Sequence, residues 1–304
     1  MTQLIRSYLP VRVSPRAYIE LTKPRIVILL VFTCVTSMIV AADALPPVDL
    51  LLLTVLGGAL SAGGASAINQ YLDRELDAKM ARTGRRPIPS GRIPEGHALV
   101  FGLALVASSV LILGGFVNWL AAILALAGAL YYVVIYTLIL KRNTVVNILI
   151  GGGAGAMPVL VGWAAASGSL ELQAFILFAI VFYWTPPHSW ALAILVNKDY
   201  AAADIPMMPV ARGEAVTRFQ ILFYSIQLVI ISLSPVLLLL QPEAPLMLDY
   251  LYLAFAALLG LILIGLAFEL IRRADKVAAR ALYKYSSLYL ALLFLAMILD
   301  RLLL

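Results

Sequence analysis

Long apolar runs separated by short polar breaks make up most of the chain. Nine such runs come close to the roughly 20 residues that an α-helix needs to cross the hydrocarbon core of a bilayer. They cover residues 26–42, 50–72, 98–117, 119–140, 145–166, 171–197, 218–240, 247–270 and 282–303. A helix satisfies its own backbone hydrogen bonds in lipid, and the sequence lacks the alternating segments of about ten residues that build a transmembrane β-barrel. The pattern therefore predicts an all-α polytopic membrane protein with nine spans.

Composition and loop lengths indicate one domain. The 304 residues are 63% hydrophobic and 12% charged, and the mean hydropathy of +0.99 lies outside the range of soluble domains. Every connection is short except residues 73–97 and 198–217, which we call the first and second polar loops. We expect residues 1–304 to form a single membrane-embedded domain. Because Cys34 is the only cysteine, an intrachain disulfide is excluded.

The basic residues fall almost entirely on one side of the predicted membrane. Of the 22 Lys and Arg residues, all but Arg301 lie in the N-terminal tail or in the loops on its side, including both polar loops. The positive-inside rule then places the N-terminus and both polar loops in the cytoplasm and the C-terminus outside. This topology and an anionic substrate explain the net charge of +6, which calls for no nucleic-acid partner. A cleavable signal peptide ending near VAADA (40–44) is the competing interpretation of the first run, which is long for that role.

A group of polar side chains ends the second apolar run. Asn69, Asp73 and Asp77 recur at every fourth residue, so on an α-helix they form one stripe that drifts about 40° per step. Oxygen ligands on one face suit a hard cation, and Mg²⁺ commonly combines one or two carboxylates with water and substrate phosphate oxygens. The stripe therefore predicts a metal site. In the alternative interpretation, the acids are the water-exposed end of a helix and pair with Arg74 and Lys79.

Basic side chains follow the acidic stripe closely. An anion that is bridged to carboxylates by a metal ion would need such cations for its outer phosphate oxygens. The candidates for diphosphate binding are Lys79, Arg82, Arg85 and Arg86 in the first polar loop, Lys141 and Arg142 after the fourth run, and Lys198 in the second polar loop. For the pair after the fourth run, ordinary anchoring at the membrane surface is the alternative explanation.

The second polar loop repeats features of the first. It too begins with acids, Asp199 and Asp204, and its proline-bearing stretch DIPMMPV (204–210) corresponds to RRPIPSG (85–91) in the first loop. Corresponding polar breaks in two halves of a membrane protein often mark a binding site. The two acids would point about 140° apart on a continuous helix, but Pro206 disfavours one, so both side chains could converge in a turn. Asp199 is the stronger candidate ligand, and Asp204 has the alternative role of a turn residue.

Five segments together resemble the UbiA-type intramembrane prenyltransferases, a family marked by one acidic motif after the second helix and another after the sixth. The segments are LTKPRI (21–26), NQYLDRELDAKMARTGRRPIPSGRI (69–93), YTLILKRNTVVNILIGGGAGAMPVLVGW (136–163), WTPPHSWALAI (184–194) and DYAAADIPMMPV (199–210). The resemblance covers almost the whole chain. The first acidic motif alone indicates only the family, whereas RTGRRPIPSGR, IGGGAGAMP and WTPPH are similar to the branch that prenylates haem.

This resemblance implies a fold, a reaction and a set of catalytic residues. The fold is nine transmembrane helices around a central cavity that the two polar loops cap. The reaction joins the farnesyl group of farnesyl diphosphate to a vinyl group of haem B, with addition of water. Asn69, Asp73 and Asp77 would hold Mg²⁺ and diphosphate, with Asp199 contributing from the opposite loop. The family's second motif is often D-x-x-x-D, whereas Asp204 lies one residue further on, which leaves its role and the number of metal ions open.

The same resemblance implies where the protein works and with what. Haem B and farnesyl diphosphate would be the substrates and Mg²⁺ the cofactor. The protein would lie in the lipid bilayer of a prokaryotic plasma membrane, with its site on the cytoplasmic side. Association with haem A synthase or with oxidase assembly proteins is also suggested.

Polar residues inside the apolar runs are further candidates. His188, in the sixth run, is a candidate functional group because intramembrane histidines are rare; it could bind haem iron or handle a proton, or be a hydrogen-bonded histidine at a helix break. Trp184 and Asn147 are candidates for the haem site or the cavity wall, with helix packing as the alternative. IGGGAGAMP (150–158) favours close packing of helix backbones over a phosphate cradle, and we expect His97 at the surface.

Three other functions remain open at this stage. A UbiA-type enzyme that prenylates a quinone or chlorophyll precursor would share the acidic stripe, although WTPPH and GGGAGAMP argue against it. An ion-coupled transporter would more often place its acids near the bilayer midplane. A haem-binding assembly factor without catalytic activity is the third.

Overall fold

A computed structural model describes residues 14–237 and 248–303, and within them nine segments are long and apolar enough to cross a membrane. These segments are α2 (Pro24–Ala42), α3 (Val48–Leu72), α5 (Glu95–Phe116), α6 with η2 and α7 (Trp119–Leu130, Tyr131–Leu140, Lys141–Asn143), α8 (Asn147–Ser167), α9 (Leu172–Leu195), α12 (Gly213–Leu237), α13 (Tyr250–Arg273) and α14 (Lys276–Leu303). The predicted all-α polytopic fold is confirmed. Residues 238–240 and 247 of two predicted spans lie outside the described residues.

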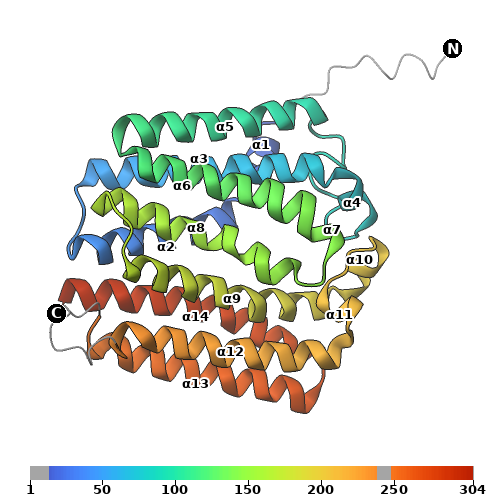
Figure 1. The fold of residues 1–304 in the computed structure, drawn as a ribbon. Helices are drawn as coiled ribbons and strands as arrows, with labels where there is room; N and C mark the ends of the chain where they lie inside the picture. The colour runs from blue at the N-terminus through green and yellow to red at the C-terminus, as the bar shows by residue number, and fades with distance from the viewer. Residues whose placement is uncertain (1–13, 238–247, 304) are drawn as a thin grey trace.

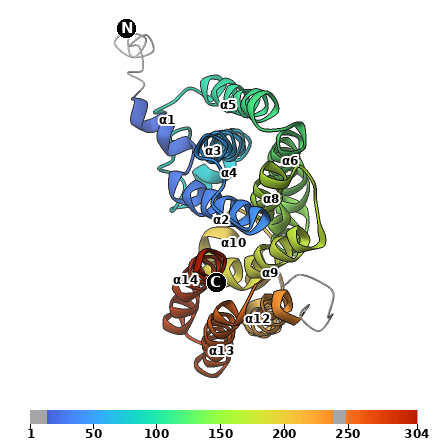
Figure 2. The same ribbon diagram turned by 90° about the vertical axis from the view of Figure 1, so that its left-hand side faces the viewer.

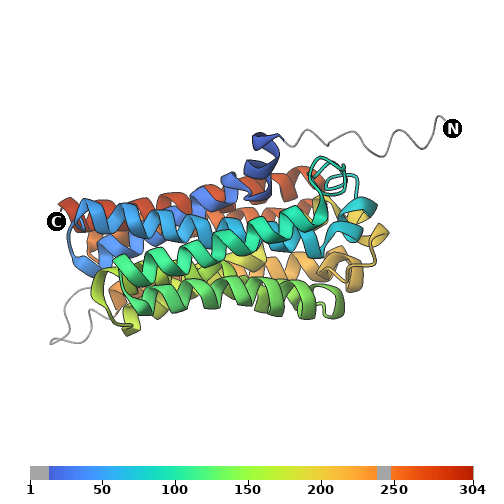
Figure 3. The ribbon, with the colours of Figure 1, turned by 90° about the horizontal axis from the view of Figure 1, so that it is seen from above.

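Both polar loops lie at the same end of the bundle, which we call the cap end (Figures 1 and 3). The first loop forms the short helix α4 (Arg74–Lys79), and the second forms α10 (Asn197–Ala202) and α11 (Met208–Ala211). The opposite end, which we call the far end, is made by the turns at residues 43–47, 117–118 and 168–171. One more short helix, α1 (Pro15–Leu21), packs its apolar side against α3 and α5.

The spanning helices surround a cavity of about 640 Å³, as the resemblance implied. Its wall is mostly apolar and is built from α2, α3, α6, η2, α8, α9 and α14. Figure 2 shows α2 and α3 on one side of the bundle interior, α8 and α9 beside them, and α14 opposite α3. Polar side chains of the wall include Lys23, Tyr132, His188 and Ser287. A volume in this range suits an organic ligand.

Small residues bring α2 and α8 into backbone contact. A Cβ added to Gly162 would overlap the carbonyl oxygen of Cys34 and lie 2.8 Å from its carbonyl carbon. The Ser37 hydroxyl donates a hydrogen bond of 2.7 Å to the Val159 carbonyl across the same contact. Earlier in α8, an added Cβ at Gly151 would overlap the ring of Tyr136. Gly151 of the glycine-rich stretch therefore packs against a side chain, whereas the backbone contact lies at Gly162, just after that stretch.

The fourth span contains a π-helix, η2, between α6 and α7. Such helices have i→i+5 hydrogen bonds, are rare, and occur mostly as short insertions near functional sites. Within η2 the Thr137 hydroxyl donates to the carbonyl of Tyr132, five residues earlier, at 2.8 Å. A π turn, closed by i→i+5 bonds, holds more residues than an α turn, so Tyr132, Thr137 and Lys141 fall close to one face. An α-helix would place the first and last of these on opposite faces.

Two helices begin earlier than the apolar pattern predicts. Helix α14 begins at Lys276 instead of residue 282, and α12 begins at Gly213 instead of residue 218. In the first case Arg280 and Lys284 point their charges outward from regular helical turns and are exposed. The apolar run ends at these charges, but the helix does not, because its buried face continues with Ala278 and Leu282. The second polar loop is correspondingly shorter than expected.

Candidate active site

The acidic stripe keeps its predicted spacing at the cap end of α3. Asp73 is the last residue before α4, and the backbone bonds Asp73 N–H to Asn69 O (2.9 Å) and Asp77 N–H to Asp73 O (2.8 Å) continue the helical pattern through the junction. Asn69 is 3% exposed, and both carboxylates are fully buried. The alternative of a water-exposed helix end is therefore wrong for these residues, because acids of that kind would keep their solvent.

Cations from two other segments satisfy one oxygen of each carboxylate. Lys141 at the end of the fourth span lies 2.5 Å from Asp73 Oδ2, and Arg86 of the first polar loop lies 2.7 Å from Asp77 Oδ2. Arg142 is 3.6 Å from Asp73 Oδ1. Oδ1 of Asp73 and Oδ1 of Asp77 are buried and accept no hydrogen bond from the described residues. Two buried carboxylate oxygens with free lone pairs fit a hard divalent cation such as Mg²⁺.

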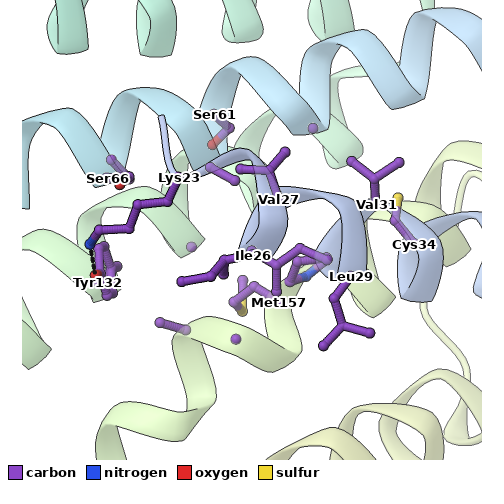
Figure 4. Close-up of a pocket in the computed structure, with 18 of the residues that line it drawn as sticks. Lys23, Ile26, Val27, Leu29, Val31, Cys34, Ser61, Ser66, Tyr132 and Met157 are labelled. Atoms are coloured by element: carbon purple, nitrogen blue, oxygen red, sulfur yellow. Dashed lines mark hydrogen bonds between the residues drawn. The ribbon is translucent and has the colours of Figure 1, made fainter. Parts of the chain in front are cut away.

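Lys23 completes this cluster, although the sequence reading did not single it out as a site residue. Its ammonium donates to Asn69 Oδ1 at 3.0 Å and to the Tyr132 hydroxyl at 3.4 Å, at the cap end of the cavity (Figure 4). Burial, together with the positive charges of Arg86 and Lys141, lowers the pKa of Lys23 to about 7. Asp77 and Asp73 act in the opposite direction on the same pKa.

The bend between α1 and α2 positions Lys23. The residue has a left-handed backbone (φ 51°, ψ 60°) immediately before Pro24. The carbonyl of Leu21, two residues before Lys23, accepts hydrogen bonds of 2.8 Å from both Ser66 and Gln70 of α3. A lysine directly before a proline is held out of the helical conformation, so the LTKPRI segment contained the signal that could have identified it.

The amide of Asn69 organises the cluster from inside. Its nitrogen donates to Asp73 Oδ2 at 2.8 Å and to the Thr137 hydroxyl of η2 at 3.0 Å. Its oxygen accepts from Lys23, so in this arrangement the amide bridges one carboxylate and one cation. Direct ligation of a metal by Asn69, as the resemblance implied, would require the ammonium to give up that oxygen.

The second polar loop is joined to the first by one polar contact between Arg82 and Tyr200, 3.5 Å from the guanidinium to the hydroxyl. Asp199 is half-buried in α10, and Asp204 is exposed in a turn with φ of 53°. Neither carboxylate accepts a hydrogen bond within the described part of the chain, where no three Asp, Glu, His or Cys side chains lie close enough to share one ion. A metal-binding role for these two acids stays a prediction.

The remaining predicted cations are at the surface of the cap end. Lys79, Arg85 and Lys198 are exposed, and their side chains bind no carboxylate among the described residues.

Asn147 is fully buried at the start of α8, where its amide nitrogen donates to the Thr144 carbonyl at 2.7 Å. Its oxygen has no hydrogen-bond partner in the described structure. This geometry is that of a helix-end hydrogen bond.

The imidazole of His188 is held between two aromatic rings on the cavity wall. Trp184 stacks on one face, 4.4 Å between centroids, and Tyr283 lies 4.7 Å from the other. The His188 Nδ1 atom is 2.8 Å from the Ser286 hydroxyl. Trp184 and His188 both line the cavity, and a role for either in binding haem stays a prediction. His97, in contrast, is exposed beside α1.

Comparison with known proteins places this geometry in a family. The sequence matches the UbiA prenyltransferase family over residues 30–296. A protoheme IX farnesyltransferase from Symbiobacterium thermophilum is 49% identical over 94% of this chain and 94% of its own length. One from Roseiflexus sp. (strain RS-1) is 53% identical over 93% of this chain but only 52% of its own, so the chain spans about half the length of that relative.

Solved structures agree on the fold. A structure of digeranylgeranylglyceryl phosphate synthase superposes with a TM-score of 0.77 at 19% identity, covering 95% of this chain and 99% of that one. A UbiA homologue from Archaeoglobus fulgidus bound to DMAPP and Mg²⁺ gives a TM-score of 0.65 at 14% identity, covering 92% and 98%. The chain therefore belongs to the UbiA prenyltransferase family, and protoheme IX farnesyltransferases are among its curated relatives.

Proposed function

We propose that this protein transfers the farnesyl group of farnesyl diphosphate to a vinyl group of haem B, in a Mg²⁺-dependent reaction that adds water and releases diphosphate and haem O. The observation that carries the proposal is the pair of buried carboxylates, each with one oxygen that accepts no hydrogen bond, set among cations and joined through Asn69 and Lys23 to the wall of an apolar cavity. The names of the curated relatives support the choice of substrates.

The polar cluster would bind the diphosphate. Asp73 and Asp77 would hold Mg²⁺ through their free oxygens, and a bound Mg²⁺ would neutralise the charge that develops on the leaving group. Lys23, Lys141 and Arg86 already point into the same cluster, where their N–H groups would bind phosphate oxygens. Such fixed donors stabilise the ionising C–O bond without reorganising during the reaction.

The cavity would hold the farnesyl chain and shield the allylic cation. Its wall is largely apolar over about 640 Å³, which matches a hydrocarbon tail and limits the access of stray water. The vinyl π electrons form a bond to C1 of the farnesyl group as the C1–O bond to diphosphate breaks. The cation left beside the porphyrin ring takes hydroxyl from one water molecule, whose proton leaves with diphosphate.

We place the cap end on the cytoplasmic side of a prokaryotic plasma membrane. The distribution of basic residues supports this orientation, although Arg6 and Arg12 of that count lie outside the described residues. An association with haem A synthase or oxidase assembly proteins would follow from the hydrophobicity of the product, which has to pass to another membrane protein.

The test supplies the purified protein with haem B, farnesyl diphosphate and Mg²⁺ and looks for farnesylated haem by mass spectrometry. Asp73→Ala or Asp77→Ala should nearly abolish product while the protein still inserts. Glu75→Ala is the matched control: this acid lies on the same short helix, but its side chain is 81% exposed, so turnover should be unchanged. Absence of product beside an active control enzyme would refute the proposed reaction, and full turnover in the two aspartate variants would refute the metal assignment.

A further inference from the structure

The surroundings of His188 fix the position of its ring protons. The Ser286 hydroxyl donates to the Tyr283 carbonyl at 2.9 Å, so toward His188 it can act only as an acceptor. The tautomer with its proton on Nδ1 is the one that fits both bonds, with Nδ1 donating to the Ser286 hydroxyl over 2.8 Å. A second hydroxyl, that of Ser287, is at the outer limit of 3.5 Å. Nε2 then has the free lone pair.

That lone pair is available to a ligand in the cavity. Nε2 makes no hydrogen bond to any described residue. It is also not fully buried, so a molecule in the cavity can reach it. His188 lies on the cavity wall, and Trp184 and Tyr283 prevent the ring from turning. Metal-binding histidines are typically held in this way, with the second nitrogen donating to a fixed acceptor.

Two cations, Arg280 just outside the cavity wall and Arg25 within it, lie toward the cap end from His188. Arg280 precedes Ser287 by seven residues, or two helical turns, so both side chains share one face of α14 about 10 Å apart along the axis. Arg25, at the start of α2, forms part of the cavity wall. Neither guanidinium forms an ion pair or hydrogen bond with a described residue, and both side chains are exposed.

The two arginines are at corresponding levels of neighbouring helices. Helices α2 and α14 both run from the cap end to the far end, where Asp43 and Arg301 form an ion pair of 2.9 Å. Arg25 and Arg280 therefore both lie near the cap end, roughly 5–10 Å above the level of Ser286 by helix rise. This separation is comparable to that between the iron of haem and its propionate carboxylates.

We propose that Nε2 of His188 binds the iron of the haem substrate and that Arg25 and Arg280 bind its propionates. The inference rests on the proposed function and adds an orientation: the porphyrin stands in the cavity with its carboxylates toward the cap end. A neutral histidine is an ordinary axial ligand of haem iron. Ligation at His188 would hold the porphyrin, and with it the vinyl groups on the edges away from the propionates, at a fixed height in the cavity.

The iron contact is tested by absorption spectroscopy without farnesyl diphosphate, so that turnover plays no part. Ferric haem B titrated into the purified protein should give a saturable, histidine-ligated Soret band. His188→Gly should lose that band and bind haem at least tenfold more weakly, and added imidazole should restore the band. His97→Ala is the matched control, because His97 is the only other histidine; its spectrum should equal that of the original protein.

Replacing the axial ligand with methionine separates the loss of the histidine ligand from misfolding of the variant. His188→Met should keep saturable haem binding but replace the histidine-ligated spectrum with a methionine-ligated one. A histidine-ligated band that persists in His188→Gly or His188→Met would overturn the proposal, as would a failure of imidazole to restore it in a folded His188→Gly protein. Farnesylated haem formed by a protein with such a persistent band would leave the proposed function standing. A wild-type protein that binds no haem would overturn both.

The propionate contacts are tested with a modified ligand. Arg280→Ala should weaken binding of haem B severalfold, and it should have no effect on binding of haem B dimethyl ester, whose carboxylates are blocked. Arg212→Ala, an exposed cation at the same end of the bundle but on the second polar loop and not on the Ser287 face of α14, should change neither affinity. Equal loss of both ligands in Arg280→Ala would overturn this part of the proposal.

Discussion

Gly162→Ala should destabilise the protein by separating α2 from α8. The new Cβ would overlap the Cys34 carbonyl oxygen and lie 2.8 Å from the carbonyl carbon, whereas carbon atoms normally meet at about 3.5–4.0 Å. The two helices must therefore move apart by about 1 Å. A gap of that size forfeits roughly a quarter to a half of each dispersion contact, which over about 30 atom pairs amounts to ~1–2 kcal/mol.

Two smaller effects change this figure. The hydrogen bond from Ser37 to the Val159 carbonyl, 2.7 Å long and three residues away, would be stretched beyond bonding distance, at a cost of about 0.6 kcal/mol for a bond within a membrane. The replacement of glycine by alanine in a helix stabilises by about 0.5–1 kcal/mol. The free energy of unfolding should therefore fall by about 1–2 kcal/mol in total.

The measurement is reversible unfolding in mixed micelles at increasing SDS fraction, followed by circular dichroism. Gly155→Ala in the same helix is the matched control, because no heavy atom lies within 4 Å of its added Cβ, and it should be neutral or slightly stabilising. Ser37→Ala should cost less in the Gly162→Ala background than alone, since the bond is already lost. If Gly162→Ala is as stable as Gly155→Ala, the inferred backbone contact between α2 and α8 is wrong.

Three further predictions concern other ion pairs and hydrogen bonds. Arg86→Ala leaves the buried Asp77 without its partner at 2.7 Å and removes a proposed phosphate donor, so initial rates should fall by roughly 10²-fold, with partial recovery in Arg86→Lys. Asp300→Ala removes the acceptor of two backbone N–H groups at the start of α13, at 2.7 and 2.9 Å, and should lower the free energy of unfolding by about 1–3 kcal/mol; an unchanged SDS midpoint would contradict this. Glu20→Gln breaks the exposed pair with Arg92, which should cost less than about 1 kcal/mol at pH 7. The hydrogen bond from Arg92 lowers the pKa of Glu20 below 4.5, so this stabilisation is present above pH 4.5 and the two proteins should become equally stable as the pH falls through the lowered pKa.

The spans and the first carboxylate group were predictable because each depends on local sequence. Apolar length alone identifies a transmembrane helix, and the fourfold spacing of Asn69, Asp73 and Asp77 survives because the backbone stays helical across the junction of α3 and α4. The early start of α14 was missed for a related reason. A reading by hydropathy stops at Arg280, whereas the helix continues wherever one face still finds apolar partners.

The partners of the carboxylates were less predictable because they depend on tertiary structure. Lys141 was one of seven candidate cations, and its approach to Asp73 requires the π register of η2, since a period of 3.6 residues would have turned Lys141 away from Tyr132. Lys23 comes from a segment 46 residues before Asn69. Its approach depends on the bonds that hold the Leu21 carbonyl, which no local pattern of the apolar runs reveals.

The π-helix η2 changes the number of residues per turn in the middle of the fourth span. Side chains before and after it therefore point in directions that one continuous α-helix would not combine. Residues before η2 line the cavity in one register, and Lys141 and Arg142 after it meet the carboxylates in another. A one-residue insertion or deletion at a lipid-facing position of η2, such as Val134, would turn Tyr136 of the cavity wall and the basic end after it by about a quarter of a revolution, and leave the wall residues before it in place. Relatives that bind a different diphosphate in the same cavity could therefore differ by chain length here, with no change in the charged residues themselves.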